Sequence, residues 1–370
     1  MKVLISISNP EKNRQKDYYF INLVNQLRNE GIQVNYLKNS LLFPLSRNLI
    51  LKGIKILNIH WINSFTNFSR KPIKTIIGTL VFIIDILIAK IFLKTKIIWT
   101  IHNLYSHEFF YPKLEHIVRK NFARISDYLV VHCKKAKSII AQEFKINQKK
   151  IEVIPHGNYI KNYPNNISMK DSRELLNINQ NDFIFLHFGR IRPHKNVELV
   201  IKSFEEIQYS GVKLMIVGNP LRSNYSKIYN LVENKENIFN RLEFIPDDEV
   251  QIYMNAADII ILSYKKILTS GEALLAMSFN KPLIAPYLGC LVDVLDKDNT
   301  FFYKYNSKKS LMKALEKSLG NRSILNDMGR ISYLKSKSYD WNEIAKKYIK
   351  TYDKPKKKNN RIRAYKDFNR

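Results

Sequence analysis

Short apolar runs alternate with amphipathic stretches along the whole chain of 370 residues. In the first half, runs rich in Ile and Val predict strands, and apolar residues recurring every three or four positions predict helices. The predicted strands are 3–8, 31–37, 54–60, 96–101, 128–132 and 151–154, and the predicted helices are 18–29, 76–93, 112–125 and 135–143. Strands and helices in this alternation form a parallel sheet covered by helices on both faces.

A polar stretch at 158–172 predicts a linker, and a second alternating series follows it. The predicted strands there are 182–188, 212–217, 242–245, 259–262 and 282–285, and the predicted helices are 197–209, 248–256, 272–279, 310–319 and 341–352. We therefore expect an α/β protein of two Rossmann-like domains, residues 1–160 and 161–340, with a basic tail at 354–370.

The apolar segment 76–93 requires a test as a membrane span. Asp85 interrupts it and Lys90 closes it, which leaves about 14 residues before Lys90, Asp85 among them, fewer than the roughly 20 apolar residues that a spanning helix needs. The pattern therefore predicts no span. The N-terminal apolar run, Met1 to Ser8, is too short for a signal peptide and predicts a strand.

The net charge is unusually positive, with 61 Lys and Arg against 32 Asp and Glu. Nine Lys or Arg and one acid lie between Arg47 and Thr100, around the apolar segment, and the tail holds eight Lys or Arg and one acid. Two interpretations of the segment have equal weight: a helix that docks on the anionic inner leaflet of the plasma membrane, and a core helix with solvated basic ends. For the tail, a solvated disordered terminus is favoured over a binding element.

The charge also leaves open a protein that binds nucleic acid, because such an excess attracts phosphate backbones. The chain has no recognisable module for base recognition, so this is the weaker alternative. Two cysteines, Cys133 and Cys290, are too few for a disulfide framework, and they favour a cytoplasmic location. Asp296-Lys297-Asp298 has the form of a metal motif but lies in a turn-rich stretch, so we expect no metal site.

The first candidate site is the loop that follows the predicted strand 182–188. Gly189 ends the strand, and Arg190 and Lys195 lie on either side of a proline-containing turn. Glycine lets a ligand approach the backbone, and the two cations could converge on a diphosphate. Taken alone, the stretch is equally consistent with two solvated basic side chains.

The second candidate site runs from Tyr264 through Lys266 to the helix predicted to start at Gly271. Thr269 and Glu272 have the spacing of a capping box, and the free N–H groups of the helix start could bind an anion together with Ser270. Glu272 is expected to cap the helix more than to contact substrate.

These stretches, with Ile154-Pro155-His156-Gly157 and with 279–286, resemble the GT-B glycosyltransferases, in particular the family-4-like enzymes of bacterial polysaccharide assembly. The resemblance implies two domains facing each other across a cleft, with the helix 341–352 crossing back onto the first. It implies a GDP- or UDP-linked sugar as donor substrate, a lipid-linked saccharide acceptor, no nucleic acid and no other cofactor. The donor-binding residues that it implies are Gly189, Arg190, Lys195, Tyr264, Lys266, Thr269, Ser270, Gly271 and Glu272.

The catalytic residues that the resemblance implies lie in the first half. His102, at the end of the predicted strand 96–101, matches the histidine that faces the donor sugar in these enzymes. The two glutamates of the retaining pattern are replaced by Ile267 and Leu275. The run 267–271, together with His60-Trp61, 100–103 and His107-Glu108, looks closer to β-mannosyltransferases that use GDP-mannose. With the two glutamates absent, this resemblance implies inversion and a separate base. Glu108 is the first candidate for that base and Asp17 the second. His60 is expected to pack beside Trp61.

Overall fold

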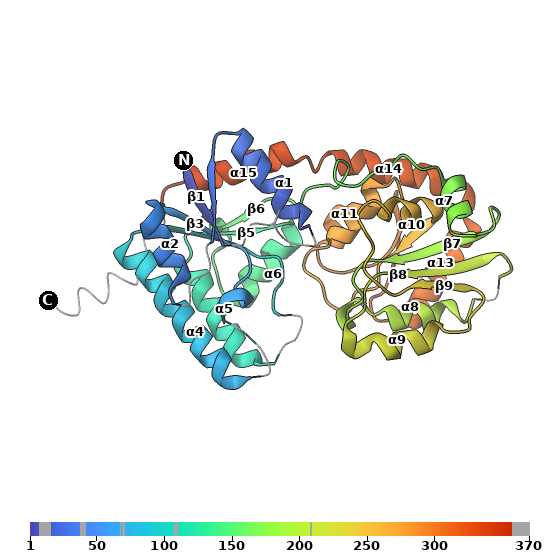
Figure 1. Ribbon diagram of the computed structural model, residues 1–370, viewed down its shortest axis with the longest axis horizontal. Coiled ribbons are helices and arrows are strands. Elements are labelled where there is room, and N and C mark those ends of the chain that lie inside the picture. Colours follow the sequence, from blue (N-terminus) through green and yellow to red (C-terminus); the bar gives the residue numbers. More distant parts are fainter. Residues whose placement is uncertain are drawn as a thin grey trace. The chain divides into compact units, whose positions relative to one another are not determined.

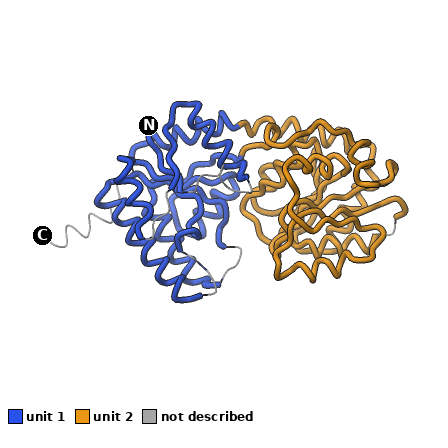
Figure 2. Tube along the Cα trace, viewed as in Figure 1, with its two compact units in different colours: residues 1–156, 341–370 blue, residues 157–340 orange. Residues whose placement is uncertain are grey.

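The computed structural model describes residues 1–6, 16–37, 42–66, 68, 71–106, 110–207 and 209–356. The chain divides into two compact units, residues 1–156 with 341–370 and residues 157–340 (Figure 2). Each unit is built on its own six-stranded parallel sheet, which confirms the expected α/β class with two Rossmann-like domains.

In unit 1 the strand order is β2-β1-β3-β4-β5-β6. The strands are β1 (Lys2–Ile5), β2 (Gln33–Tyr36), β3 (Ile56–Ile59), β4 (Lys96–Thr100), β5 (Tyr128–Val131) and β6 (Ile151–Val153). The helices are α1 (Tyr18–Asn29), α2 (Pro44–Lys52), α3 (Asn63–Thr66), α4 (Pro72–Leu87), η2 (Ile88–Phe92), α5 (Pro112–Ile125), α6 (Lys134–Phe144), η3 (Gln148–Lys150) and α15 (Trp341–Asp353). Figure 1 shows α1 and α15 on one face of the sheet and α4 and α5 on the other.

A buried chain of hydrogen bonds ties α15 to α1 and to the sheet. The Tyr348 hydroxyl lies 2.9 Å from the Tyr19 hydroxyl, and Asn58 Nδ2 donates to the Tyr352 hydroxyl at 2.9 Å. Thr100 Oγ1 joins the two pairs, because it donates to Asn58 Oδ1 at 3.0 Å and lies 3.4 Å from the Tyr348 hydroxyl. Because every member is buried and bonded, these polar side chains fix the position of α15 without leaving an unsatisfied group.

In unit 2 the strand order is β12-β11-β10-β7-β8-β9. The strands are β7 (Phe183–Phe188), β8 (Val212–Val217), β9 (Ile238–Arg241), β10 (Ile259–Ile261), β11 (Leu283–Pro286) and β12 (Thr300–Tyr303). The helices are α7 (Met169–Leu175), η4 (Pro193–Lys195), α8 (Val197–Phe204), η5 (Arg222–Asn224), α9 (Tyr225–Val232), α10 (Val250–Ala256), α11 (Gly271–Ser278), α12 (Leu291–Val294), α13 (Lys308–Gly320), η6 (Arg322–Ile324) and α14 (Leu325–Lys337). The strand order reverses between β7 and β10, and in open sheets of this kind ligands bind at the carboxyl ends of the strands beside that reversal.

Two local predictions in this unit are wrong. The strand predicted at 242–245 lies instead at β9, which pairs with β8 from Ile238 to Arg241. β9 is an edge strand with an exposed Asn240 and a half-buried Arg241, so its apolar signal is weak. The predicted linker 158–172 contains the start of α7, where Ser168 Oγ accepts a hydrogen bond from Asp171 N at 3.1 Å.

The apolar segment of unit 1 forms one continuous helix of 21 residues, Pro72–Phe92, which by length and composition alone could cross a membrane. The length argument against a span is therefore wrong, because Asp85 does not end the helix. Its carboxylate accepts hydrogen bonds from Leu45 N and Ser46 N, both at 2.8 Å, and so caps the start of α2. Lys90 bonds Asp127 at 2.5 Å inside the unit. The polar side of this helix faces inward. Both a membrane-spanning helix and the core helix of a water-soluble domain have this feature, so it does not distinguish between them.

The outward side of the same helix is apolar. Ile73 is 71% exposed and Phe92 75% exposed, and Leu51 on the neighbouring α2 is 74% exposed. We call the following set of exposed side chains the apolar face: Ile50, Leu51, Ile73, Ile76, Ile77, Leu80, Ile83, Ile84, Leu87, Ile91 and Phe92. Not all of the basic residues counted in the sequence surround it, because Lys90 and Lys96 are bonded within the unit.

Candidate active site

The loop after β7 and the loop after β10 meet at the strand reversal of unit 2. Gly189 has a φ of +107°, and a Cβ placed on it would clash with the carboxylate of Glu272. Gly218, with a φ of +136°, would in turn clash with the carbonyl of Gly189. Glycine at position 189 therefore lets the loop after β7 approach Glu272, and glycine at position 218 lets the loop after β8 approach the backbone of Gly189.

Three side chains of the predicted donor site form one cluster there. Lys195 Nζ is ion-paired with Glu272 Oε1, and the Tyr264 hydroxyl donates to Glu272 Oε2 at 2.5 Å. The Tyr264 hydroxyl also lies 2.9 Å from Ser270 Oγ. Burial and the neighbouring Arg192 and Arg190 lower the pKa of Lys195 to about 7, whereas the ion pair with Glu272 favours its charged form. We call these residues the Lys195 cluster: Lys195, Tyr264, Ser270 and Glu272.

The predicted capping box is in the wrong register. The N-cap of α11 is Ser270, whose Oγ accepts a hydrogen bond from Ala273 N at 3.2 Å. Glu272 contributes nothing to the cap, because its carboxylate turns to Lys195, 77 positions away in the sequence. The expectation that Glu272 caps the helix is therefore wrong.

The remaining predicted donor residues surround this cluster. Gly271 is the first residue of α11, and Thr269 is half-buried beside it. Arg190 and Lys266 are exposed. Ile267 is half-buried and Leu275 is buried in the core, so neither position of the retaining pattern offers a polar group.

In unit 1, one histidine follows each of four neighbouring strands. His60, His102, His132 and His156 come directly or within three residues after β3, β4, β5 and β6. Because the strands are parallel, all four side chains gather at one edge of the sheet. The ring of Tyr19 contacts each of them, with centroid distances of 4.9 to 5.9 Å.

Three of these rings form a hydrogen-bonded chain. His60 Nδ1 lies 3.0 Å from His102 Nε2, and His102 Nδ1 lies 3.2 Å from His132 Nε2. His132 Nδ1 bonds the carbonyl oxygen of Ile154 at 2.9 Å. Burial lowers the pKa of His132 to about 4 and holds those of His60 and His102 well below the usual value. We call these three residues the histidine chain; its rings are neutral at pH 7.

The histidine chain corrects the expectation for His60, which packs against Phe20 with a centroid distance of 4.7 Å and bonds His102. Trp61 instead contacts the His102 ring, at 5.1 Å between centroids. Glu108, the first candidate base, lies outside the described residues. Asp17, the second, stands at the N-cap position of α1, where its carbonyl accepts a hydrogen bond from Ile21 N.

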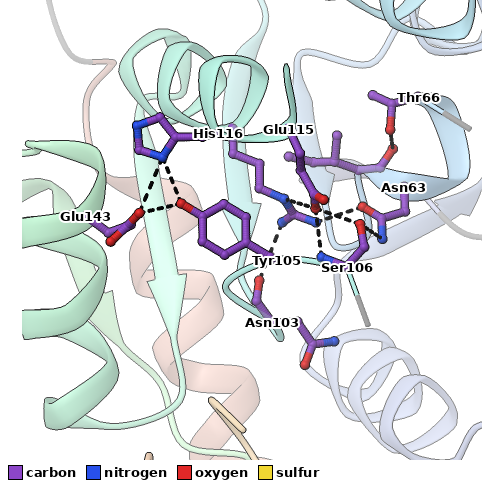
Figure 3. A network of polar contacts seen from close by, with 10 residues as sticks. Asn63, Thr66, Asn103, Tyr105, Ser106, Glu115, His116 and Glu143 are labelled. Carbon is purple, nitrogen blue, oxygen red and sulfur yellow. Dashed lines mark hydrogen bonds and ion pairs between the residues drawn. The ribbon is translucent and has the colours of Figure 1, made fainter. Parts of the chain in front are cut away.

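A second polar network holds the loop that follows His102 (Figure 3). Glu115 Oε1 accepts from Ser106 N and Oγ at 2.7 and 2.6 Å and pairs with Arg119 at 2.7 Å. Arg119 also donates to Asn63 Oδ1 at 2.7 Å and to the carbonyl of Asn103. The loop 103–106 is thus anchored on a buried ion pair directly before the segment that contains Glu108.

Each sheet edge offers different chemistry. The unit 2 edge has a buried cation, a carboxylate and the N-terminus of α11, a set that suits a phosphate group and the hydroxyls of a sugar. The unit 1 edge has neutral imidazoles, which suit hydroxyl groups. Among the residues that the structure describes, no group of three His, Cys, Asp or Glu side chains could hold a metal ion.

Sequence reasoning did not single out His132, and it used His156 only as part of a motif. The signal was available, since each comes within three residues after an apolar strand, as His60 and His102 do. The pairing of Lys195 with Glu272 had no such signal.

Comparisons with known proteins give a family model for each half of the chain. Residues 18–158 match the family model described as Glycosyltransferase Family 4, and residues 168–335 match the model described as Glycosyl transferases group 1. A GDP-mannose:glycolipid 4-beta-D-mannosyltransferase of Xanthomonas campestris pv. campestris is 31% identical over 103 residues, which are 28% of this chain and 30% of that protein. A lipopolysaccharide 1,2-N-acetylglucosaminetransferase of Salmonella typhimurium is 20% identical over 58% of this chain and 61% of that one. The chain thus matches less than two thirds of the length of either relative.

Solved structures with the same fold cover nearly the whole chain. Sucrose-phosphate synthase from Thermosynechococcus elongatus superposes with a TM-score of 0.75 at 14% identity, over 95% of this chain and 98% of that one. Anabaena HepE in complex with UDP and glucose superposes with a TM-score of 0.72 at 16% identity, over 95% and 99% of the two chains. At such identities the likeness concerns the fold.

Proposed function

The chain belongs to the family-4-like glycosyltransferases of the GT-B fold, and we propose that it transfers a hexose, with mannose as the candidate, from a nucleotide diphosphate sugar to a lipid-linked or polysaccharide acceptor of the cell surface. The Lys195 cluster at the strand reversal of unit 2 carries this proposal. It places a buried cation and a helix N-terminus where ligands of such sheets bind. The relatives give no support to the nucleic-acid alternative.

The proposed mechanism needs no metal ion. Lys195 and Arg190 neutralise the diphosphate as the glycosidic bond breaks, and the free N–H groups at Gly271 assist them. A preorganised cation of this kind lowers the barrier because it is already in place when the negative charge develops. Glu272 holds Lys195 in position through Oε1, and its Oε2 accepts a hydrogen bond from the Tyr264 hydroxyl.

The proposed stereochemical course is inversion. The positions of the retaining glutamates hold Ile267 and Leu275, so transfer on the same face lacks its usual carboxylates. Direct displacement then requires a base for the acceptor hydroxyl, and Glu108 is the candidate. Product NMR tests this: a β-mannoside formed from the α-linked donor GDP-mannose supports inversion, and an α-mannoside refutes it.

The proposed location is the cytoplasmic face of the plasma membrane, where the chain binds peripherally. The apolar face is flanked by exposed cations, including Arg47, Lys55, Lys74 and Lys94. Apolar burial combined with attraction to anionic lipid holds amphipathic helices in the membrane interface. The basic tail, most of which lies outside the described residues, adds to this attraction.

Flotation with vesicles tests the location. The chain should float with vesicles that contain anionic lipid, and high salt or carbonate should release it. Ile77→Ser with Leu80→Ser should abolish flotation, while Leu334→Ser, an exposed leucine of unit 2, serves as the matched control. Retention after carbonate extraction would instead indicate a spanning helix at Pro72–Phe92.

A panel of UDP- and GDP-linked sugars tests the activity itself. A true donor should raise the melting temperature, because only the folded chain binds it, and should release its nucleoside diphosphate when acceptor lipid is present. If no member of the panel binds or is consumed, the proposed function is wrong.

A further inference from the structure

The histidine chain has a direction, which its last partner determines. The carbonyl oxygen of Ile154 can only accept, so His132 Nδ1 carries the proton in that 2.9 Å bond. A neutral imidazole has one N–H, so His132 Nε2 is an acceptor, and the proton in its 3.2 Å contact belongs to His102 Nδ1. The same argument makes His102 Nε2 an acceptor for His60 Nδ1–H at 3.0 Å.

The histidine chain ends at His60, whose Nε2 is an unpaired acceptor in the described part of the protein. His60 Nε2 is buried and has no hydrogen-bond partner among the groups that the structure describes. The direction therefore passes without interruption from the Ile154 carbonyl to His60, and a change of tautomer at any one member would break at least one of these hydrogen bonds.

The surroundings keep the three rings neutral. They pack around Tyr19 and Phe20, and Trp61 lies against His102. Among the described residues, these rings bond to one another and to the Ile154 carbonyl, and none of them bonds to a carboxylate that would stabilise a positive charge. The low pKa values of the three imidazoles follow from this burial.

We propose that His132, anchored on the Ile154 carbonyl, is a positioning residue that holds His102 in one orientation and as the Nδ1–H tautomer, so that His102 offers a substrate hydroxyl a neutral acceptor at Nε2. His60 Nδ1–H is the donor at that nitrogen in the structure, and a hydroxyl can replace it without moving a proton in the chain. A phosphate or carboxylate oxygen has no proton to donate and is rejected. The inference rests on the proposed function, since a sugar supplies the hydroxyl.

Nitrogen NMR of the protein labelled with ¹⁵N-histidine tests the tautomers directly. The chain has eight histidines, and the signals of His60, His102 and His132 can be assigned by replacing each in turn. All three should show a protonated Nδ1 and an unprotonated Nε2. Detection of His102 as the Nε2–H tautomer in the wild-type chain would overturn the inference, whatever the activity.

Two variants of His132 separate positioning from simple packing. His132→Phe keeps a ring of similar size without nitrogens, so His102 should revert to the Nε2–H tautomer that a free imidazole favours. His132→Asn keeps a donor near the Ile154 carbonyl, but its shorter side chain does not reach the position of Nε2, so His102 Nδ1 loses its partner and the tautomer should shift in the same way. His116 does not belong to the histidine chain, so His116→Gln is the control and should leave the tautomers of His60, His102 and His132 unchanged.

The kinetic expectation follows from the tautomer. Both His132 variants should lower kcat by about 10- to 100-fold, as the loss of second-layer partners does for metal-bound histidines, with less than about threefold change in donor KM. An unchanged His102 tautomer and unchanged kcat in His132→Phe would refute the positioning role. If the wild-type chain transfers no sugar at all, the proposed function fails, while the tautomer signals still decide whether His132 orients His102.

Discussion

The two sheets of this protein are built alike, yet the groups at their carboxyl edges differ in kind. Unit 2 brings together a buried ion pair, Lys195 with Glu272, at the start of a helix. Unit 1 brings together neutral rings that are bonded to one another. The same scaffold thus supports one edge that suits a charged diphosphate and one that suits uncharged hydroxyls, which is the division of labour that transfer between a nucleotide sugar and a saccharide requires.

The comparison is sharpened most by removing the carboxylate of Glu108, which follows His102 by six positions in the sequence. If the histidine chain is not basic enough to accept a proton, the acceptor hydroxyl needs another base, and Glu108 is the nominated one. Glu108→Gln keeps the shape of the side chain and removes its basicity, so kcat should fall by about 10²–10⁴-fold with little change in donor binding. Initial rates at saturating donor measure this. Activity within threefold of wild type would demote Glu108 to an ordinary loop residue.

Removing the cation of the charged edge should have the next largest effect. Lys195→Ala and Arg190→Ala should each lower turnover by about 10²–10³-fold, because a group that stabilises the leaving diphosphate is lost. Lys227→Ala, which removes a lysine paired with Glu198 on the surface of the same unit, is the matched control. Near-normal rates for both site variants would overturn the diphosphate assignment.

Lowering the pH should reduce the folding stability of unit 1 more than that of unit 2. Folding lowers the pKa of His132 from 6.5 to about 4, so the unfolded chain binds more protons in this range, and stability rises with pH between these values. This group alone accounts for about 3 kcal/mol between pH 7 and pH 4, and His60 and His102 shift in the same direction.

Hydrogen exchange followed separately in each unit tests this effect. In the described part of unit 2, His187 is the histidine with a lowered pKa, about 3. Protection in unit 1 should therefore be lost at a higher pH than protection in unit 2. Equal losses in the two units would contradict the account of a neutral edge.

The smallest of these effects concerns the scaffold beneath the apolar face. Asp85→Asn leaves one oxygen where two backbone N–H groups of α2 are bonded, and it removes the negative charge at that helix start. The free energy of unfolding should fall by about 1–2 kcal/mol. Asp298→Asn, in an exposed turn of unit 2, should change it by less than about 0.5 kcal/mol. A melting temperature unchanged by Asp85→Asn would show that α2 does not depend on this cap.

Periodic features of the sequence were sufficient for most of the fold. The bounds of α1 and α5 agree with the structure at both ends, since an amphipathic repeat marks the one and Pro112 at the first turn marks the other. The strand β9 was predicted at the wrong residues because the apolar alternation of an edge strand is weak. Asp85 was interpreted as an interruption of the helix because the groups that it bonds lie on another helix. Local pattern does not encode such contacts between distant segments.

The candidate sites divide in the same way. Gly189, Lys195 and Ser270 were found because they belong to short motifs, whereas the contact of Glu272 with Lys195 spans 77 positions and needed the fold. The histidine chain lies between these cases: each histidine is visible at a strand end, but only the strand order makes them neighbours.

Sugar transfer itself is the measurement that tests the central claim most directly. Purified chain, vesicles containing lipid-linked saccharide and GDP-mannose or another sugar of the UDP and GDP panel should yield a glycosylated lipid and one equivalent of nucleoside diphosphate, and Lys195→Ala should reduce both by the same factor. The account is contradicted if no sugar of the panel is transferred, or if the product forms equally well when Lys195 is absent.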